Sequence, residues 1–220
     1  MNQSVKIKKS VFWLSLVSLI FAVLQSSVFF MDLKYTSPGP SPVLTFRLPT
    51  LAGFISFLLE IAIPTLWFIY VFKFHGSNNG RWFLPVIFGL IAFNELYGSN
   101  FNFLLRKIES IEFFFHINNI RVLVFAVAFI LAAISAVKGA HQKLFFIIAS
   151  SVGLLVVLLH LVNSINSLVF IFTHGLHVFS VASPAWLLAK ATLYISLLLF
   201  SLKSLKSEAN KQITENEPNI

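Results

Sequence analysis

Residues 120–137 read IRVLVFAVAFILAAISAV, and this stretch decides the fold. Its only charge is Arg121, and the run is long enough to cross the hydrocarbon core of a bilayer as a helix. No water is available there to bond the backbone, so a spanning segment must satisfy its own N–H and C=O groups, as a helix does. The stretch therefore predicts a transmembrane helix.

Five further segments have a similar length and character, and none shows the period-two alternation of a barrel strand. They are Val11–Phe30, Leu51–Phe74, Trp82–Phe103, Leu144–Val162 and Ala185–Leu202. The segment Trp82–Phe103 is the weakest, because polar residues interrupt it near its end. We expect an all-α, polytopic integral membrane protein: a six-transmembrane-helix bundle in one domain, residues 1–202, followed by a disordered polar tail, residues 203–220.

The composition supports this class of protein. Hydrophobic residues make up 57% of the chain and charged residues 11%, with a mean hydropathy of +0.86. A soluble domain has about 45–50% apolar and about 25% charged residues, so a water-soluble globule is excluded. The absence of cysteine excludes disulfides and thiolate metal sites. We expect no cofactor, and no nucleic-acid partner, because no basic stretch interleaved with aromatic residues occurs.

Orientation follows from the distribution of Lys and Arg, which concentrate in cytoplasmic segments. With both termini cytoplasmic, the inner segments hold ten positive residues: Lys6, Lys8, Lys9, Lys73, Arg81, Lys138, Lys143, Lys203, Lys206 and Lys211. The outer segments hold five: Lys34, Arg47, Arg106, Lys107 and Arg121. Lys is more frequent than Arg, and Asn, Ile and Phe are all common, as in proteins from AT-rich bacterial genomes. We therefore expect a bacterial inner membrane.

The sequence also predicts the conformation of three segments between the spans. The loop Met31–Thr50 contains four prolines and should be an extended, stiff spacer. The second outer loop should form an amphipathic helix in the outer interface, with Leu104, Leu105, Ile108, Ile111 and Phe115 on one face and Arg106, Lys107, Glu109 and Glu112 elsewhere. The stretch Asn163–Ser183 fits either an extension of the fifth span or a re-entrant segment.

Charged residues inside a bilayer are rare and usually face protein or water. Glu60, Glu95 and Lys190 lie within predicted spans, and His160 and Asn163 lie near the outer end of the fifth. At about 1.5 Å per residue, all fall in the outer half of the membrane. One interpretation is a shared polar cavity, open to the outside, that binds a solute, a proton or a lipid head group. The other is a snorkelling lysine with protonated or hydrogen-bonded carboxyls.

Two histidines and four alanines form further patterns. His174 and His177, spaced i and i+3, are weak candidates for metal ligands; two interfacial histidines are the simpler interpretation. Small residues at every fourth position let helices approach closely. In this chain alanine recurs at every fourth position, at Ala128, Ala132, Ala136 and Ala140. The pattern predicts either a packing face within the chain or a docking face for a partner subunit or a second copy.

Three classes of function therefore stay open. The polar residues favour small-solute binding or transport through an outward-facing polar cavity. A non-catalytic accessory or regulatory membrane protein is the alternative. A membrane enzyme acting on lipid or on exported precursors is less favoured, because the chain contains no nucleophile elbow, no phosphate-binding loop and no dinucleotide fingerprint. The lipid bilayer is the one partner that every class requires.

Overall fold

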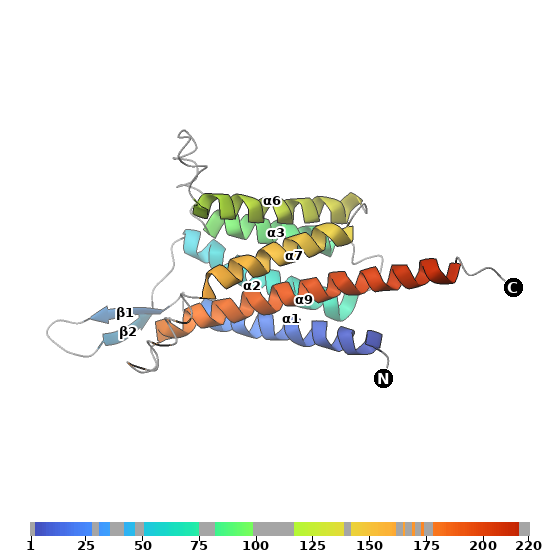
Figure 1. Ribbon diagram of the computed structural model, residues 1–220. Coiled ribbons are helices and arrows are strands. Elements are labelled where there is room, and N and C mark those ends of the chain that lie inside the picture. Colours follow the sequence, from blue (N-terminus) through green and yellow to red (C-terminus); the bar gives the residue numbers. More distant parts are fainter. Residues whose placement is uncertain are drawn as a thin grey trace, which may run out of the picture.

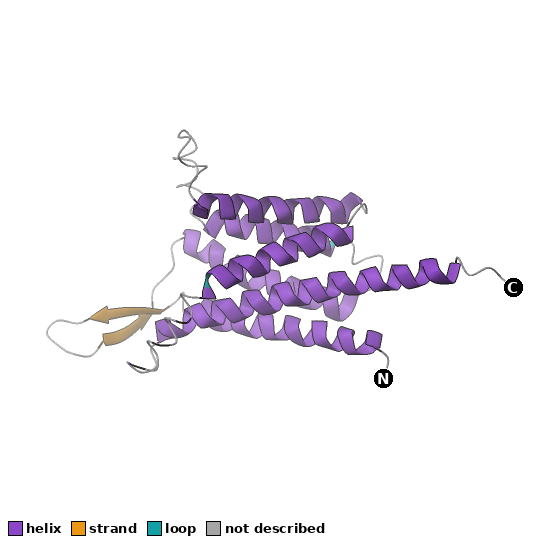
Figure 2. Ribbon diagram, viewed as in Figure 1, coloured by secondary structure: helices purple, strands orange, loops and turns teal. Residues whose placement is uncertain are grey.

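The computed structural model describes residues 3–27, 31–35, 42–46, 51–74, 82–98, 117–138, 142–161 and 178–215, and the single positions 165, 169 and 173. Within this part the fold is a helical bundle with one β-hairpin at its edge (Figure 1, Figure 2). Its helices are α1 (Gln3–Ser27), α2 (Leu51–Ile69), α3 (Phe83–Gly98), α6 (Ile117–Lys138), α7 (Gln142–Leu159) and α9 (Val178–Glu215).

Five of these helices are long and apolar enough to cross a membrane, as a multi-pass membrane protein requires. The exception is α3, an apolar helix of 16 residues. It covers most of the predicted third span, and residues 99–103 of that span lie outside the described residues. Helix α2 continues as a turn of π-helix, η2 (Tyr70–Phe74).

A hairpin occupies part of the first outer loop. Strands β1 (Met31–Tyr35) and β2 (Pro42–Phe46) pair antiparallel, with Met31 opposite Phe46 and Tyr35 opposite Pro42. We expected extended chain here but not strand pairing, which gives the extended backbone hydrogen-bond partners. The predicted interfacial helix, residues 104–115, lies outside the described residues.

Helix α9 is longer at both ends than the predicted sixth span. It begins at Val178, so residues 178–183 extend this helix rather than the fifth span or a re-entrant segment. It continues to Glu215, which differs from the disordered tail expected for residues 203–215. The physical reason is composition: residues 203–215 are rich in Lys, Leu, Glu, Ala and Gln, which favour helices, and contain neither Gly nor Pro.

The helices are arranged as a closed ring. The principal contacts join α1 to α2, α2 to α3, α3 to α6, α6 to α7, α7 to α9, and α9 back to α1. The first turns of α1 and the last turns of α9 lie at the same end of the bundle, and the hairpin lies at the opposite end (Figure 1). We call the part of the ring nearer the hairpin the hairpin half.

Aromatic side chains fill the centre of the ring, and a serine hydroxyl bonds to one of them. Trp67, Phe88, Phe125 and Phe129 are fully buried, and the ring centroids of Phe125 and Phe129 lie 4.6 Å apart. The Trp67 indole N–H donates to the Ser196 hydroxyl, which ties α2 to α9. This bond satisfies a buried indole that would otherwise lack a partner.

Helix α1 carries a buried stripe of small residues that the sequence analysis did not single out, and Ser18 of this stripe contacts α9. Ser15, Ser18, Ala22 and Ser26 recur every three or four residues and are all at most 1% exposed. In α6, Ala128, Ala132 and Ala136 are likewise buried in the chain's own core, and Ala140 lies outside the described residues. Small side chains in both helices allow close backbone approach.

Candidate functional site

The centre of the candidate site is an ion pair between two helices that flank α1. The ammonium of Lys190, on α9, lies 2.8 Å from Oε2 of Glu60, on α2. The Lys190 side chain is only 10% exposed and that of Glu60 only 12%. Two charges withdrawn from water to this extent are tolerated only when each has a partner. The pair therefore accounts for two of the residues proposed from the sequence.

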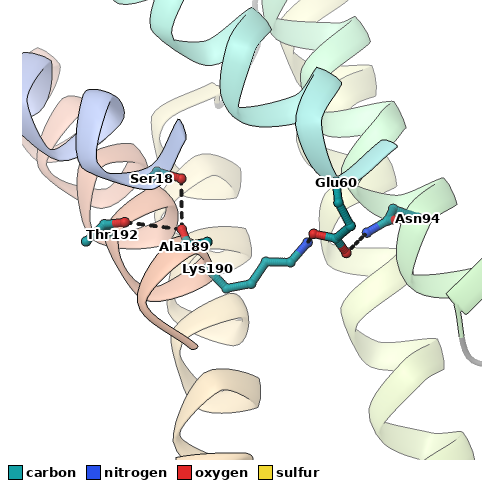
Figure 3. A network of polar contacts seen from close by, with 6 residues as sticks. All are labelled: Ser18, Glu60, Asn94, Ala189, Lys190 and Thr192. Atoms are coloured by element: carbon teal, nitrogen blue, oxygen red, sulfur yellow. Dashed lines mark hydrogen bonds and ion pairs between the residues drawn. The ribbon is translucent and has the colours of Figure 1, made fainter. Parts of the chain in front are cut away.

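The second oxygen of Glu60 is also bound. Asn94, on α3, donates its side-chain amide to Oε1 of Glu60 at 2.9 Å, and Asn94 is itself buried (Figure 3). One carboxylate thus holds α9 through Lys190 and α3 through Asn94. With both oxygens engaged, the orientation of the carboxylate is fixed.

Hydroxyl groups fix the backbone from which Lys190 extends. Ser18 of α1 donates to the carbonyl of Ala189 at 2.8 Å, and Thr192 donates to the same carbonyl at 3.2 Å (Figure 3). Ala189 directly precedes Lys190 and is 2% exposed. The base of the lysine side chain is therefore held against α1 while its ammonium crosses to α2.

Glu95 belongs to the same group of charges. It follows Asn94 on α3 and is half-buried. It interacts electrostatically with the cations of Lys190 and Arg121 and with the carboxylate of Glu60. Glu95 therefore connects the Glu60–Lys190 pair to a second cation, on α6.

That second cation is Arg121, and it contacts His160. Nη1 of Arg121 lies 2.8 Å from Nε2 of His160, at the end of α7. A guanidinium only donates hydrogen bonds, so Nε2 is the acceptor and the imidazole is neutral, with its proton on Nδ1. The His160 ring meets the Trp186 ring edge-on, at a centroid distance of 5.0 Å. Nε of Arg121 is buried and has no hydrogen-bond partner within the described residues.

Together these side chains form what we call the polar cluster, in the hairpin half of the ring: Glu60, Asn94, Glu95, Arg121, His160 and Lys190. They come from α2, α3, α6, the end of α7, and α9. Within the cluster, the Glu60–Lys190 pair sets one negative charge against one positive charge.

Two members were missed from the sequence. Asn94 was treated as an interruption of a weak span, and Arg121 was counted among the outer flanking charges. In the structure Arg121 lies near the start of α6 as Glu95 lies near the end of α3, so both belong to the hairpin half. The predicted span, which began at Ile120, had placed Arg121 at its outer end and away from the other charges.

Three further residues proposed from the sequence, one for the cavity and two for a metal, are not among the residues that the structure describes. Asn163, His174 and His177 lie outside the described residues. Among the residues that the structure describes, no group of three or more His, Asp or Glu side chains could hold a metal ion. The polar cluster has one imidazole and two carboxylates, but both carboxylates face cations of the chain itself.

The chain matches no protein-family model, no curated protein and no solved structure.

Proposed function

We propose that this is a six-span protein of a bacterial inner membrane, with both termini cytoplasmic, that binds or transports a small solute through its polar cluster. The ten-to-five asymmetry of Lys and Arg supports the orientation. The position of both ends of the helical bundle on one side, with the hairpin opposite, supports an even number of spans (Figure 1). In this orientation the hairpin half faces outward.

One observation carries the proposal: charged side chains from separate helices gather at one depth rather than bonding each to a neighbour on its own helix. Lys190 bonds across to α2, and Arg121 bonds across to the end of α7. Intramembrane ionisable groups that meet inside a bundle commonly mark pathways for ions or solutes. A site between helices also offers the several convergent polar groups that small-molecule binding needs.

The test is access from outside. The chain contains no cysteine, so Glu60→Cys introduces a single thiol. A membrane-impermeant maleimide added to intact cells should label Glu60→Cys. Ser41→Cys, in the predicted outer loop, is the positive control, and Ala132→Cys, at a position that is 0% exposed, is the negative control. Labelling of Ser41→Cys without labelling of Glu60→Cys would contradict an outward-facing site.

A loss-of-function assay complements the labelling. Glu60→Gln keeps the shape and hydrogen-bonding capacity of the side chain but removes its charge. We expect it to lose function in whatever phenotype a deletion strain shows, while the paired variant Lys138→Gln, on an exposed lysine of α6, keeps it. Full function in the Glu60→Gln strain would remove the support for a charge-dependent site.

The second candidate is a non-catalytic accessory protein, and one observation favours it. The Glu60 carboxylate and the Lys190 ammonium satisfy each other within the chain, and Asn94 binds the other carboxylate oxygen, as an internal brace between α2, α3 and α9 would. Under that alternative, Glu60→Cys is unlabelled in intact cells. The Glu60→Gln strain keeps its phenotype as long as the protein folds. The labelling experiment therefore separates the candidates directly, and the phenotype of Glu60→Gln does so once a melting curve of the purified variant shows that it is folded at the growth temperature.

A further inference from the structure

We infer that the polar cluster selects a zwitterion: a ligand with one primary ammonium group and one carboxylate or phosphate. The inference rests on the proposed function, and it names the ligand class for the same site. The chemistry is shared by free amino acids and by the phosphoethanolamine head group of a lipid.

Charge balance is the first argument. Glu60 and Lys190 form a buried pair of opposite charges at 2.8 Å. A ligand of net charge entering this partly dehydrated group would leave one charge without compensation, which is strongly unfavourable in a protein interior. A zwitterion brings one charge of each sign, so every charge still has a partner after binding.

The fixed Glu60 carboxylate is the second argument. Asn94 holds Oε1, so Oε2 is the oxygen that exchanges partners. A ligand ammonium can replace the Lys190 ammonium at Oε2, because both are compact donors of hydrogen bonds. Lys190 is then released to donate to the ligand's anionic group. The exchange needs no movement of α2 or α3, since the Asn94 contact persists throughout.

Arg121 supplies the third argument. One of its nitrogens donates to His160, while its buried Nε has no hydrogen-bond partner within the described residues. A planar guanidinium presents donors in a fixed fork that matches a carboxylate or a phosphate. The anionic group of the ligand can thus bond to Lys190 and to the unused donor of Arg121. This gives the Nε–H of Arg121 an acceptor, which it lacks among the residues that the structure describes.

Trp186 provides a reporter for the test. Its ring contacts His160, which in turn bonds to Arg121, so a ligand that engages Arg121 should change the Trp186 fluorescence. The purified full-length chain in detergent is titrated with glycine, γ-aminobutyrate, acetate and ethylammonium. A second series adds phosphatidylethanolamine or phosphatidylcholine to the micelles. Trp186→Phe should abolish the change in signal and so assign it to this residue.

We expect a saturable change with glycine or γ-aminobutyrate if the ligand is a free solute, and with phosphatidylethanolamine if it is a head group. Phosphatidylcholine should be inactive, because its quaternary ammonium has no N–H to donate to Glu60. The double variant Glu60→Gln/Lys190→Gln leaves no unpaired buried charge at this pair and should weaken binding at least about tenfold, as for one lost charge-assisted bond. Lys138→Gln is the matched control and should bind as the parent does.

Saturation by acetate alone or by ethylammonium alone overturns the zwitterion inference and leaves the proposed solute site standing. Equal binding of phosphatidylcholine and phosphatidylethanolamine also overturns it, because no N–H donor would then be needed. If no probe gives a saturable change, the inference fails, while the outward-facing site is judged separately by the labelling of Glu60→Cys.

Discussion

Removing either partner of the Glu60–Lys190 pair should destabilise the fold, and removing both should do so much less. Each side chain is about nine-tenths buried, so a single neutral substitution leaves a dehydrated charge without its partner. Breaking a buried pair from one side typically costs about 3–5 kcal/mol of unfolding free energy. Replacing both partners with neutral groups removes the charges together, which is often close to neutral for stability.

The surrounding charges predict which single variant is worse. After Glu60→Gln, Lys190 still has the carboxylate of Glu95 in electrostatic range. After Lys190→Gln, the carboxylates of Glu60 and Glu95 repel each other and have lost the Lys190 cation that interacts with both. The loss should therefore be larger for Lys190→Gln than for Glu60→Gln, and smallest for the double variant.

Thermal unfolding in detergent measures this order. At about 2–4 °C per kcal/mol for a chain of this size, the single variants should melt about 6–20 °C below the parent. The double-mutant cycle gives the coupling, which is the amount by which the summed losses of the two single variants exceed the loss of the double variant. Additive losses, with the double variant as unstable as the sum of the two singles, would refute the pairing argument.

Three further predictions concern packing and topology. A Cβ at Gly153 would lie 2.8 Å from ring atoms of the buried Tyr194, so Gly153→Ala should lower stability by about 1–3 kcal/mol in the same melting assay; an unchanged midpoint would mean that the ring moves freely. Ala132→Leu adds bulk at a position that is 0% exposed and should lower stability by a similar amount of about 1–3 kcal/mol, whereas a midpoint equal to the parent's would place this face against lipid. Reporter fusions after Ser77 and after Lys206 should both report the cytoplasmic side, and an external signal from the second would require an odd number of spans.

The helices could be predicted from the sequence because long apolar runs leave the backbone few alternatives in a membrane. Each predicted span overlaps one of the helices of the structure, and five of these helices are long and apolar enough to cross a membrane. What failed was the treatment of segments outside the spans: the pairing of β1 with β2 and the continuation of α9 to Glu215. Strand pairing depends on contacts between distant residues, and the local pattern of four prolines gave no sign of it.

The candidate site was predictable in part, because the position of a residue along a membrane helix can be counted from the sequence. The distance of Glu60 and Lys190 from the ends of their helices follows from counting residues, so their similar depth was visible in the sequence. Their direct contact was not, because α2 and α9 both flank α1 and their rotation about their own axes is set by packing. The contact between α1 and α9 was unpredictable for the same reason. Nothing in the sequence indicates that the hydroxyl of Ser18 donates to the carbonyl of Ala189 on α9.

The location of the charges bears on why the chain retains them. A buried ion pair usually adds little to stability compared with well-packed apolar side chains of similar volume. The other half of this ring shows that such packing is attainable here, because Trp67, Phe88 and Phe129 fill its centre with at most 1% exposure. If bracing the helices were the only requirement, apolar packing of this kind could also supply it in the hairpin half. The chain instead concentrates two carboxylates, two cations, an amide and an imidazole there. The ligand site that we propose would account for this arrangement, whereas a need for stability alone would not.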